Sequence, residues 1–592
     1  KNHPVTEKMY KNIIKMCKRI AGFPRYLSVH PGGVIIAPDE ITNYTALEIS
    51  GKGLVISQHD MRAVEKLGLV KMDILGVRGL SVITDCLKDV ASKNEKRGEN
   101  IRRGNLKYLE SIKKNDKETM KMIMQGRTVG CFQLESPAMR GLLKKMQVQV
   151  IKDVIDAVAV IRPGPSEAGM KDAFIRRRAG VEKPEYIHPV LKPILRETYG
   201  VVVYQEQVLR IAKAVAGFSY GEADLLRRAM TKSRKSEVIK PLKKKFIEGA
   251  AKKGIQERSA DEIWRFMENF VGYGFNKAHS ATYGILAYKS AYLKYHHPVP
   301  FMTAVLNNGG GFYSMAAYIE EARRMGIKIA HPDVNNAEKL FTSKGKTITC
   351  GLFTVLKLSD KSMKRLISER KKSPYKDIFD FLDRSGIMQT EAINLAKCGA
   401  LRSIMQSEAE AITIIKVYFR NNRKINVTRK LIDGLNLPPN TQKQKIMSEL
   451  EILGFAVSGH PLSLFSEIEF NTHLTTSVSL EKMKDRQIKT AAWMVTSRRA
   501  PTSSGKYVKF ATLEDKEGLM EAVLFPDVYE KYGKILRGYG PFYIKGTVQS
   551  RVQGESNIIV ESVQKIKDKE IKKTDYKIFD RDLEDDMFFD VA

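Results

Sequence analysis

Cysteine is scarce in this chain of 592 residues, which holds five scattered thiols. No two cysteines have CxxC spacing, and none lies near a histidine at the spacing of zinc ligands. The pattern argues against a disulfide framework and a structural zinc site, and it is typical of a reducing cytoplasm. The five positions are Cys17, Cys86, Cys131, Cys350 and Cys398.

Long apolar runs are also missing from the sequence. No uninterrupted apolar segment is long enough to span a bilayer, and the start lacks the charged-then-apolar pattern of a signal segment. We therefore expect no membrane partner. The length predicts about four domains, and the first residue, Lys1 rather than Met, indicates a trimmed or incomplete chain.

Acidic residues are few relative to basic ones. The chain has 67 Asp and Glu against 100 Lys and Arg, a formal charge of +33. An excess of this size favours a polyanionic partner, with nucleic acid first and a membrane surface or an acidic protein second. Affinity for nucleic acid should then fall steeply with salt.

Hydrophobic periodicity predicts a multidomain α+β chain. Residues 1–28 have the pattern of a basic amphipathic helix, and two short strands follow, at residues 34–36 and in the run through Asp73. The pattern is then mostly helical from about residue 80 to 330 and again from about 360 to 430. From about 480 to 568 a period of two predicts a small five-stranded barrel, a fold that often binds single strands.

The stretch GLVKMDILGVRGL, residues 68–80, places two charges in a run that otherwise has the pattern of a buried strand. Lys71 and Asp73 are two residues apart, so a strand would point both side chains from the same face. Burying an unpaired charge is expensive. We therefore expect this pair to face a partner, a metal ion or a substrate.

The segment FSYGEADLLRRAMTKSRKS, residues 218–236, gathers cations that suit a triphosphate. Arg227 and Arg228 lie on a predicted helix, and guanidinium groups bind phosphate oxygens in two-pronged fashion. A solvated helix with an ion pair between Asp224 and Arg228 explains the same spacing, and on spacing alone it is the better interpretation. The cations that follow in the segment are Lys232, Arg234 and Lys235.

Asn276, Lys277 and His279 precede a long apolar helix in residues 270–298. Polar residues at a helix N-terminus can form an anion site with its exposed amides. Asn276 as an N-cap, with His279 as a surface residue, explains the pattern equally well. Both interpretations stay open at this point.

Three other segments are explained by ordinary structure. Arg140 and Arg162 lie near tight turns in GCFQLESPAMRGLLKKM and IRPGP. DIFDFLDR, residues 377–384, has acids three apart and could be mistaken for a metal motif. Helical pattern follows these aspartates, so we interpret them as a charged helix start.

Together these segments resemble one family, the alpha subunit of bacterial DNA polymerase III of the DnaE type, a C-family replicative polymerase. The resemblance implies a DNA-directed DNA polymerase of the bacterial cytoplasm, which transfers nucleotides from dNTPs to a primer 3′-hydroxyl in replication or translesion synthesis. It extends from about His30 to Lys565, in the family's order, through HPGG, GLVKMDILG, GCFQLES, IRPGP, ETYGVVVYQEQV, ADLLRRAM, YGFNKAHSATYG, HPDVN and LGFAVSGHPL.

The family's architecture implies a partial nucleotidyltransferase-type palm, large mostly helical fingers, a helix-hairpin-helix region and a five-stranded OB barrel. The implied domains are a thumb remnant at 1–28, the carboxy-terminal part of the palm at 29–80, fingers at 81–345, the helix-hairpin-helix region at 346–430, a linker with LGFAVSGHPL at 431–478, an OB-fold domain at 479–568 and an acidic tail at 569–592.

The resemblance also implies roles for matching residues. Asp73 resembles one of three palm aspartates that hold two Mg²⁺ ions, and Lys71 resembles a residue near the phosphates of the incoming nucleotide. The implied nucleotide-binding residues are Arg227, Arg228, Lys232, Asn276, Lys277 and His279. The implied partners are primer–template DNA, dNTPs, single-stranded template at the OB fold, a sliding clamp and other replisome subunits.

The sequence departs from the family in four respects. After LRRAM the family usually has a glycine and two lysines, whereas Thr231, Lys232 and Ser233 stand here. No P-D-x-D-type segment with the other two aspartates precedes Asp73, and the family's amino-terminal PHP domain is missing, so we expect this chain alone to be inactive. The hairpin LKLSDKSM, residues 356–363, lacks glycine, which makes close backbone approach to a phosphate harder. No clear clamp-binding peptide lies between about residues 400 and 450.

These departures leave an alternative function open. The chain could be a non-catalytic nucleic-acid-binding or replisome scaffold protein, which kept the fingers and the barrel and lost the chemistry. The coding sequence upstream of Lys1 would separate the two, because an in-frame P-D-x-D segment supports the polymerase.

Overall fold

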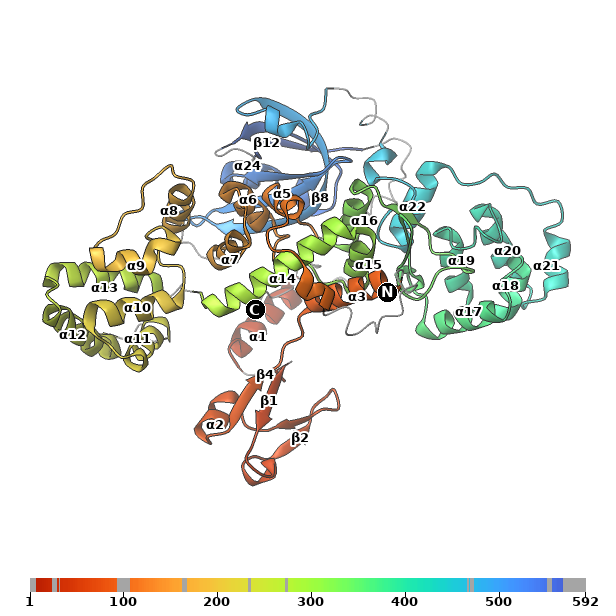
Figure 1. Ribbon diagram of the computed structural model, residues 1–592. Coiled ribbons are helices and arrows are strands. Elements are labelled where there is room, and N and C mark those ends of the chain that lie inside the picture. Colours follow the sequence, from red (N-terminus) through yellow and green to blue (C-terminus); the bar gives the residue numbers. More distant parts are fainter. Residues whose placement is uncertain are drawn as a thin grey trace. The chain divides into compact units, whose positions relative to one another are not determined.

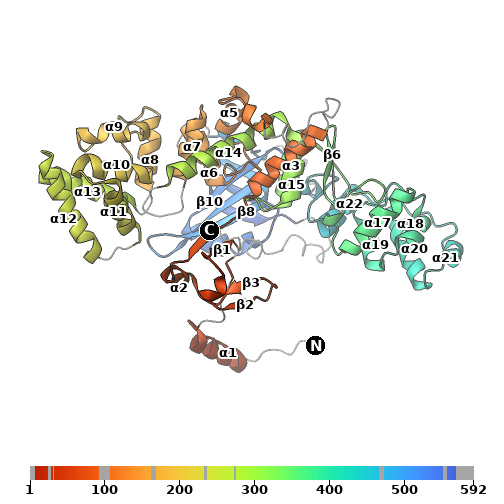
Figure 2. The same cartoon turned by 60° about the horizontal axis from the view of Figure 1, so that its bottom comes forward.

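The structure is a computed structural model of the chain (Figures 1 and 2). It describes residues 7–23, 29–30, 32–92, 107–161, 168–232, 236–271, 275–465, 468, 473–550 and 556–567. The chain divides into two compact units, residues 1–78 and residues 79–592. None of the helices in the described ranges combines the length and the apolar content that a bilayer span needs.

The first unit consists of short elements and two separate two-stranded sheets. Its elements are α1 (Glu7–Ile20), β1 (Gly33–Ile36), η1 (Ile41–Asn43), β2 (Leu47–Ile49), β3 (Val55–Ser57), α2 (Met61–Lys66) and β4 (Val70–Asp73). β1 pairs antiparallel with β4, so that Gly33 lies opposite Asp73, and β2 pairs antiparallel with β3. The pair β1–β4 confirms the two strands predicted from the sequence.

The prediction that the strand through Asp73 is buried is wrong. Val70 and Met72 of β4 are 57% and 47% exposed. The cause is that a two-stranded sheet gives each strand a single neighbour and does not by itself build a core. In the described part of this unit, buried apolar side chains are limited to Val64 and Leu69, and no residue of α1 is buried.

The second unit begins with a long series of helices, as the periodicity of residues 80–330 predicts. They are α3 (Arg78–Ser92), α5 (Lys117–Met124), α6 (Pro137–Met146), α7 (Ile151–Val160), α8 (Ala168–Arg178), η3 (Pro189–Leu191), α9 (Lys192–Leu195), η4 (Arg196–Thr198), α10 (Gln205–Ala216), α11 (Tyr220–Lys232), α12 (Ser236–Lys252), α13 (Glu257–Val271), α14 (Lys277–His296), α15 (Pro298–Asn308) and α16 (Met315–Arg324).

Two groups of these helices position the candidate site. α10 packs against α11, α12 and α13 (Figure 1), around the buried rings of Phe246 and Trp264, whose centroids are 5.4 Å apart. α14 packs against α7 at Gly284. A Cβ atom at Gly284 would lie 2.9 Å from the Cα of Ile155, so only glycine permits this close approach.

A small mixed sheet and a second helical group follow. β7 pairs parallel with β5 and antiparallel with β6. Asp377 caps its helix by accepting hydrogen bonds from the N–H groups of Phe379 and Asp380, which confirms the charged helix start. The elements are β5 (Lys328–Ala330), β6 (Thr342–Lys344), β7 (Thr347–Thr349), η5 (Leu352–Thr354), α17 (Asp360–Lys372), α18 (Ile378–Ser385), α19 (Gln389–Lys397), α20 (Glu408–Arg420), α21 (Ile425–Leu431) and α22 (Gln442–Ile452).

The buried Glu449 of α22 joins two of the sequence motifs. Its Oε1 lies 2.6 Å from Nε2 of His331, in HPDVN. Its Oε2 accepts hydrogen bonds from the N–H groups of Val457 and Ser458, in LGFAVSGHPL, at 2.8 Å each. Burial raises the pKa of Glu449, but the hydrogen bonds from His331 and Ser458 outweigh burial and lower it. The two motifs therefore act as one structural junction.

The carboxy-terminal part of the described chain is a closed five-stranded barrel in the order β10-β12-β11-β8-β9. β10 and β12 are parallel and the other neighbours are antiparallel. This confirms the predicted barrel. The elements are η6 (Pro461–Leu464), η7 (Leu480–Lys482), β8 (Gln487–Pro501), β9 (Tyr507–Glu514), β10 (Leu519–Leu524), α24 (Pro526–Tyr532), η8 (Ile535–Arg537), β11 (Phe542–Gln549) and β12 (Asn557–Lys565).

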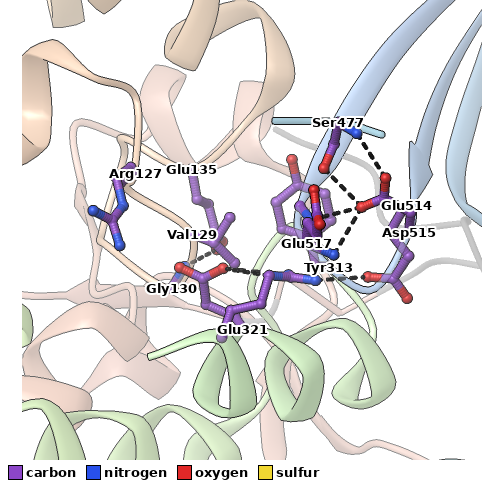
Figure 3. A network of polar contacts seen from close by, with 12 residues as sticks. Arg127, Val129, Gly130, Glu135, Tyr313, Glu321, Ser477, Glu514, Asp515 and Glu517 are labelled. Atoms are coloured by element: carbon purple, nitrogen blue, oxygen red, sulfur yellow. Dashed lines mark hydrogen bonds and ion pairs between the residues drawn. The ribbon is translucent and has the colours of Figure 1, made fainter. Parts of the chain in front are cut away.

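A buried chain of charges connects the barrel to the helices (Figure 3). Nζ of Lys294 donates to the carbonyl oxygens of Arg127 and Val129 and lies 2.6 Å from Oε1 of Glu321. Arg324 contacts the same Glu321 at 3.3 Å and reaches Oε2 of Glu514, in β9, at 3.4 Å. The side chains from α14, α16 and the barrel therefore form one connected set.

Glu514 is the carboxylate of this set whose ionisation is disfavoured by burial. Burial raises the pKa of its carboxyl to about 8, although the nearby Arg324 lowers it. The folded protein therefore retains a proton that the unfolded chain loses near pH 4.5. Because the folded state binds more protons in this window, the contribution of Glu514 to stability falls as the pH rises from about 4.5 to about 8.

We expect Glu514→Gln to stabilise the protein increasingly between pH 4.5 and 8, and to reach a constant advantage above that range. The glutamine oxygen can still accept from Arg324 and carries no ionisable proton. Thermal unfolding midpoints of variant and wild type, measured across this pH range, test the prediction. A difference between the two proteins that does not change with pH would contradict it.

Candidate nucleotide and DNA site

Asp73 ends β4 with its carboxylate next to Lys71. Oδ1 of Asp73 lies 2.5 Å from Nζ of Lys71 and 3.7 Å from Nδ1 of His30. The hydrogen bond from Lys71 is the main reason why the pKa of Asp73 is lowered. The structure thus brings the two predicted charges together on one face, with the Asp73 side chain 48% exposed.

The HPGG motif makes this arrangement possible. The backbone N–H of Ile74 donates to the carbonyl oxygen of Gly32 at 2.7 Å. A Cβ atom at Gly32 would lie only 2.4 Å from the carbonyl oxygen of Ile74, which no side chain tolerates. Glycine at this position therefore allows the chain to pass closely beside the residue that follows Asp73.

Asp73 does not belong to a complete metal site within the described residues. No group of three or more His, Cys, Asp and Glu side chains in this part of the chain lies close enough to hold a metal ion. Two Mg²⁺ ions need several oxygen ligands in defined geometry. The residues present therefore do not fit a two-metal centre, although a half-exposed carboxylate with a lowered pKa can serve as one ligand.

Arg227 and Arg228 share one carboxylate on α11. NH2 of Arg227 lies 2.8 Å and Nε of Arg228 lies 2.7 Å from the oxygens of Asp224. The ion pair between Asp224 and Arg228, which was the better interpretation on spacing alone, is therefore present. The side chain of Lys232 lies outside the described residues, as do Arg234 and Lys235.

Asn276 caps α14. Its Oδ1 accepts a hydrogen bond from the N–H of His279 at 2.8 Å, which confirms the capping interpretation. The N–H of Lys277 donates to both carboxylate oxygens of Glu206 at 3.1 Å each. A carboxylate of the protein thus already occupies the anion position at this helix N-terminus, which the alternative interpretation assigned to a ligand.

Residues 203–206 connect the two groups of cations. Phe275, just before α14, donates to the carbonyl oxygen of Val203 and accepts from the N–H of Gln205. Oε1 of Gln205 accepts from NH1 of Arg227 at 3.3 Å. The start of α10 therefore contacts both α11 and the start of α14, and it brings Arg227 and Lys277 into one cluster.

His279 forms part of a column of rings beside this cluster. Its ring stacks on Tyr283 with centroids 3.9 Å apart, and the ring of Phe275 makes an edge contact with it at 5.2 Å. Tyr283 in turn contacts Phe132, of the GCFQLES motif, at 5.2 Å. Two motifs that are far apart in the sequence therefore meet at this column.

Four family models match separate parts of the chain. Residues 1–76 match the bacterial DNA polymerase III alpha NTPase domain, and residues 79–254 match the bacterial DNA polymerase III alpha subunit finger domain. Residues 326–411 match a helix-hairpin-helix motif and residues 488–566 an OB-fold nucleic acid binding domain.

Curated relatives agree with these matches. The chain is 32% identical to the DNA polymerase III subunit alpha of Aquifex aeolicus over 92% of its own length and 46% of the relative. The corresponding Bacillus subtilis protein is 31% identical over 95% of this chain and 51% of the relative. The error-prone DNA polymerase of Symbiobacterium thermophilum is 31% identical over 89% and 52%.

The chain belongs to the bacterial DNA polymerase III alpha subunit family. It spans about half the length of the curated relatives that it matches. The resemblance found from the sequence motifs is thereby confirmed.

Within this polymerase III alpha fold, sequence reasoning missed three residues of the cluster. Glu197 pairs with the ammonium group of Lys277, Gln205 accepts from the guanidinium of Arg227, and Glu206 accepts from the backbone N–H of Lys277. All three lie in ETYGVVVYQEQV, which we used only as a mark of the family. The available signal was the amide of Gln205 beside the carboxylate of Glu206, in a motif that precedes both cation motifs in the sequence.

The glycine-free hairpin LKLSDKSM contains a residue whose backbone has the left-handed conformation. Lys357 has a φ of 62°, which is unfavourable for a residue with a side chain. The N–H of Ser359 donates to the fully buried Glu391 at 2.9 Å, and the N–H of Met388 donates to the same carboxylate at 3.1 Å. The Ser359 amide is therefore paired with a carboxylate of the protein rather than free for a phosphate.

Of the two arginines that we explained by structural turns, the structure describes one. Arg140 lies in α6, where its Nε donates to the carbonyl oxygen of Gly126 at 2.9 Å and its NH1 to the hydroxyl of Tyr313 at 3.3 Å. These contacts give it a structural role. Arg162 lies outside the described residues.

We expect Lys71→Met to raise the pKa of Asp73 toward its ordinary value, because the hydrogen bond from Lys71 is the largest cause of the lowered pKa. Carbon NMR of protein with labelled aspartate, titrated from neutral to acidic pH, measures this pKa. Lys66→Met, which removes another exposed lysine of the same unit, is the control. An unchanged pKa of Asp73 in Lys71→Met would contradict the prediction.

Proposed function

We propose that this chain forms the nucleotide- and DNA-binding part of a DNA-directed DNA polymerase, which transfers nucleotides from dNTPs to a primer 3′-hydroxyl. The observation that carries the proposal is the match to DNA polymerase III alpha subunits over 89–96% of the chain. The cluster of Arg227, Arg228 and Lys277 supports it, because it joins cations from two helices beside a column of rings.

In this proposal the cluster holds the triphosphate. Arg228 is 65% exposed and Lys277 is 45% exposed, so both reach solvent from positions that Asp224 and Glu197 define. A guanidinium offers two parallel donors to phosphate oxygens and an ammonium offers a point charge. Lys232 and Asn276 are further proposed contacts, and His279 would meet the nucleotide with the face or edge of its ring.

The OB barrel would hold single-stranded template on the outer face of β8, β9 and β10. Phe510 of β9 is 47% exposed and lies directly opposite Arg498 of β8 and Val523 of β10. Residues directly opposite on neighbouring strands share one face. An exposed ring beside a guanidinium is the combination on which a base stacks while its phosphate is neutralised.

Asp73 would act as one metal ligand, and Lys71 would hold its carboxylate and lie near the nucleotide phosphates. When bound, Mg²⁺ would activate the primer hydroxyl and stabilise the leaving pyrophosphate. The described residues alone do not complete such a centre. We expect primer extension to need carboxylates in addition to Asp73. A sliding clamp, other replisome subunits and a bacterial cytoplasmic setting are further parts of the proposal.

We expect Arg227→Ala and Arg228→Ala each to weaken binding of dATP about tenfold, because a charge-assisted hydrogen bond contributes about 1.5–3 kcal/mol. Calorimetric titration of the whole chain with dATP in Mg²⁺ buffer measures this, and binding of single-stranded DNA should be unchanged. The control is Arg258→Ala, an exposed arginine of α13 that pairs with Glu262.

Two outcomes would count against the assignment of these arginines. Loss of DNA affinity with unchanged dATP binding would move them to the DNA site. If the wild-type chain binds single-stranded DNA but no dATP, the scaffold alternative is favoured over the polymerase.

We expect Phe510→Ala to weaken binding of oligo-dT at least fivefold, because stacking of one base on a ring contributes about 1–3 kcal/mol. Fluorescence anisotropy of labelled oligo-dT at constant salt measures the change. Phe312→Ala removes a similarly exposed ring outside the barrel and serves as the control. Equal affinities of the Phe510→Ala and Phe312→Ala proteins would exclude this face as the binding surface.

A further inference from the structure

The cations of the nucleotide cluster are each paired with a carboxylate. Arg227 and Arg228 share Asp224. Nζ of Lys277 lies 2.8 Å from both oxygens of Glu197. A site that attracts a triphosphate by charge alone would leave its cations unneutralised, so these carboxylates need an explanation.

Glu197 differs from the other carboxylates because it comes from a separate, rigid turn. It lies in η4, which ends at Tyr199 with a left-handed φ of 54°. The buried hydroxyl of the next residue, Thr198, accepts from Nε2 of the buried Gln207 at 2.8 Å. This turn fixes the backbone of Glu197, so the pair with Lys277 opens by rotation of side chains.

Lys277 has a second contact that it can keep when it leaves Glu197. Its Nζ lies 5.3 Å from the centroid of the Tyr204 ring, and that ring is held by a hydrogen bond from its hydroxyl to Asp156 at 2.6 Å. The aromatic face stabilises a cation without neutralising it. Lys277 therefore has a position in which its charge is available to a ligand.

The pair is accessible, with Lys277 45% and Glu197 31% exposed. An ion pair of such exposure changes an equilibrium by a factor of about 1.5 to 5. A phosphate chain that offers several charge-assisted contacts at once competes effectively with a single carboxylate of this strength.

We propose that Glu197 is a competing counter-ion of Lys277, which an incoming triphosphate displaces. Glu197 is a positioning residue: it contacts Lys277 and not the ligand, and it weakens binding of any ligand that must use Lys277. This inference rests on the proposed function, because it takes the cluster to be the triphosphate site.

The direction in which nucleotide affinity changes separates this role from a merely structural one. If Glu197 only supported the fold, its loss would weaken nucleotide binding. If it competes for Lys277, Glu197→Gln should strengthen binding of dATP about threefold. The glutamine keeps the size of the side chain and removes its charge.

The experiment measures dissociation constants of dATP and of inorganic tripolyphosphate, in Mg²⁺ buffer, for the whole 592-residue chain. The variants are Glu197→Gln, Lys277→Met and the double variant. Glu182→Gln is the matched control, because Glu182 is also 31% exposed and pairs with Arg176 and Arg177 instead. It removes the same charge without touching Lys277 and should leave both affinities unchanged.

Support for the proposal requires tighter binding in Glu197→Gln and no effect of that change in the Lys277→Met background. Equal gains for dATP and tripolyphosphate would place the competition at the phosphates. Unchanged or weaker binding in Glu197→Gln, or a gain that persists without Lys277, would overturn the inference and leave the proposed function standing. If none of the proteins binds dATP or tripolyphosphate, both the inference and the nucleotide site fail.

Discussion

A single buried ammonium group, that of Lys294, determines how several parts of the second unit are held. Its side chain is almost fully enclosed, and it satisfies two backbone carbonyl oxygens and the carboxylate of Glu321. An uncompensated buried charge costs several kcal/mol, so these partners must stay in place. Through Arg324 the same set reaches Glu514 of the barrel.

The helix that carries Lys294 connects this set to the cluster of Arg227, Arg228 and Lys277. α14 is 20 residues long and has Lys277 at its start, Gly284 against α7 and Lys294 near its end. This one helix is thus held at both ends and in the middle. The residues just before the GCFQLES motif are held by the same helix, because Lys294 donates to the carbonyl oxygens of Arg127 and Val129.

Much of this architecture could be predicted from the sequence, since it depends on local patterns. The strand pair around Asp73, the long helical region, the barrel and the cap at Asn276 follow from periodicity and from residue types at element ends. The pairing of Lys277 with Glu197 could not, because the two are 80 residues apart and only tertiary packing joins them. The exposure of β4 was missed because its composition is typical of a buried strand.

The ribbon formed by β1 and β4 has a consequence for the timescale on which Asp73 is ordered. It has two strands and a largely exposed face, so its backbone hydrogen bonds open at low free-energy cost compared with those inside the closed barrel. Amide protons beside Asp73 would therefore exchange with solvent long before those of the barrel. The carboxylate is held by a pair of strands with little stability of their own. How precisely the Asp73 side chain is positioned therefore depends on what packs against that ribbon.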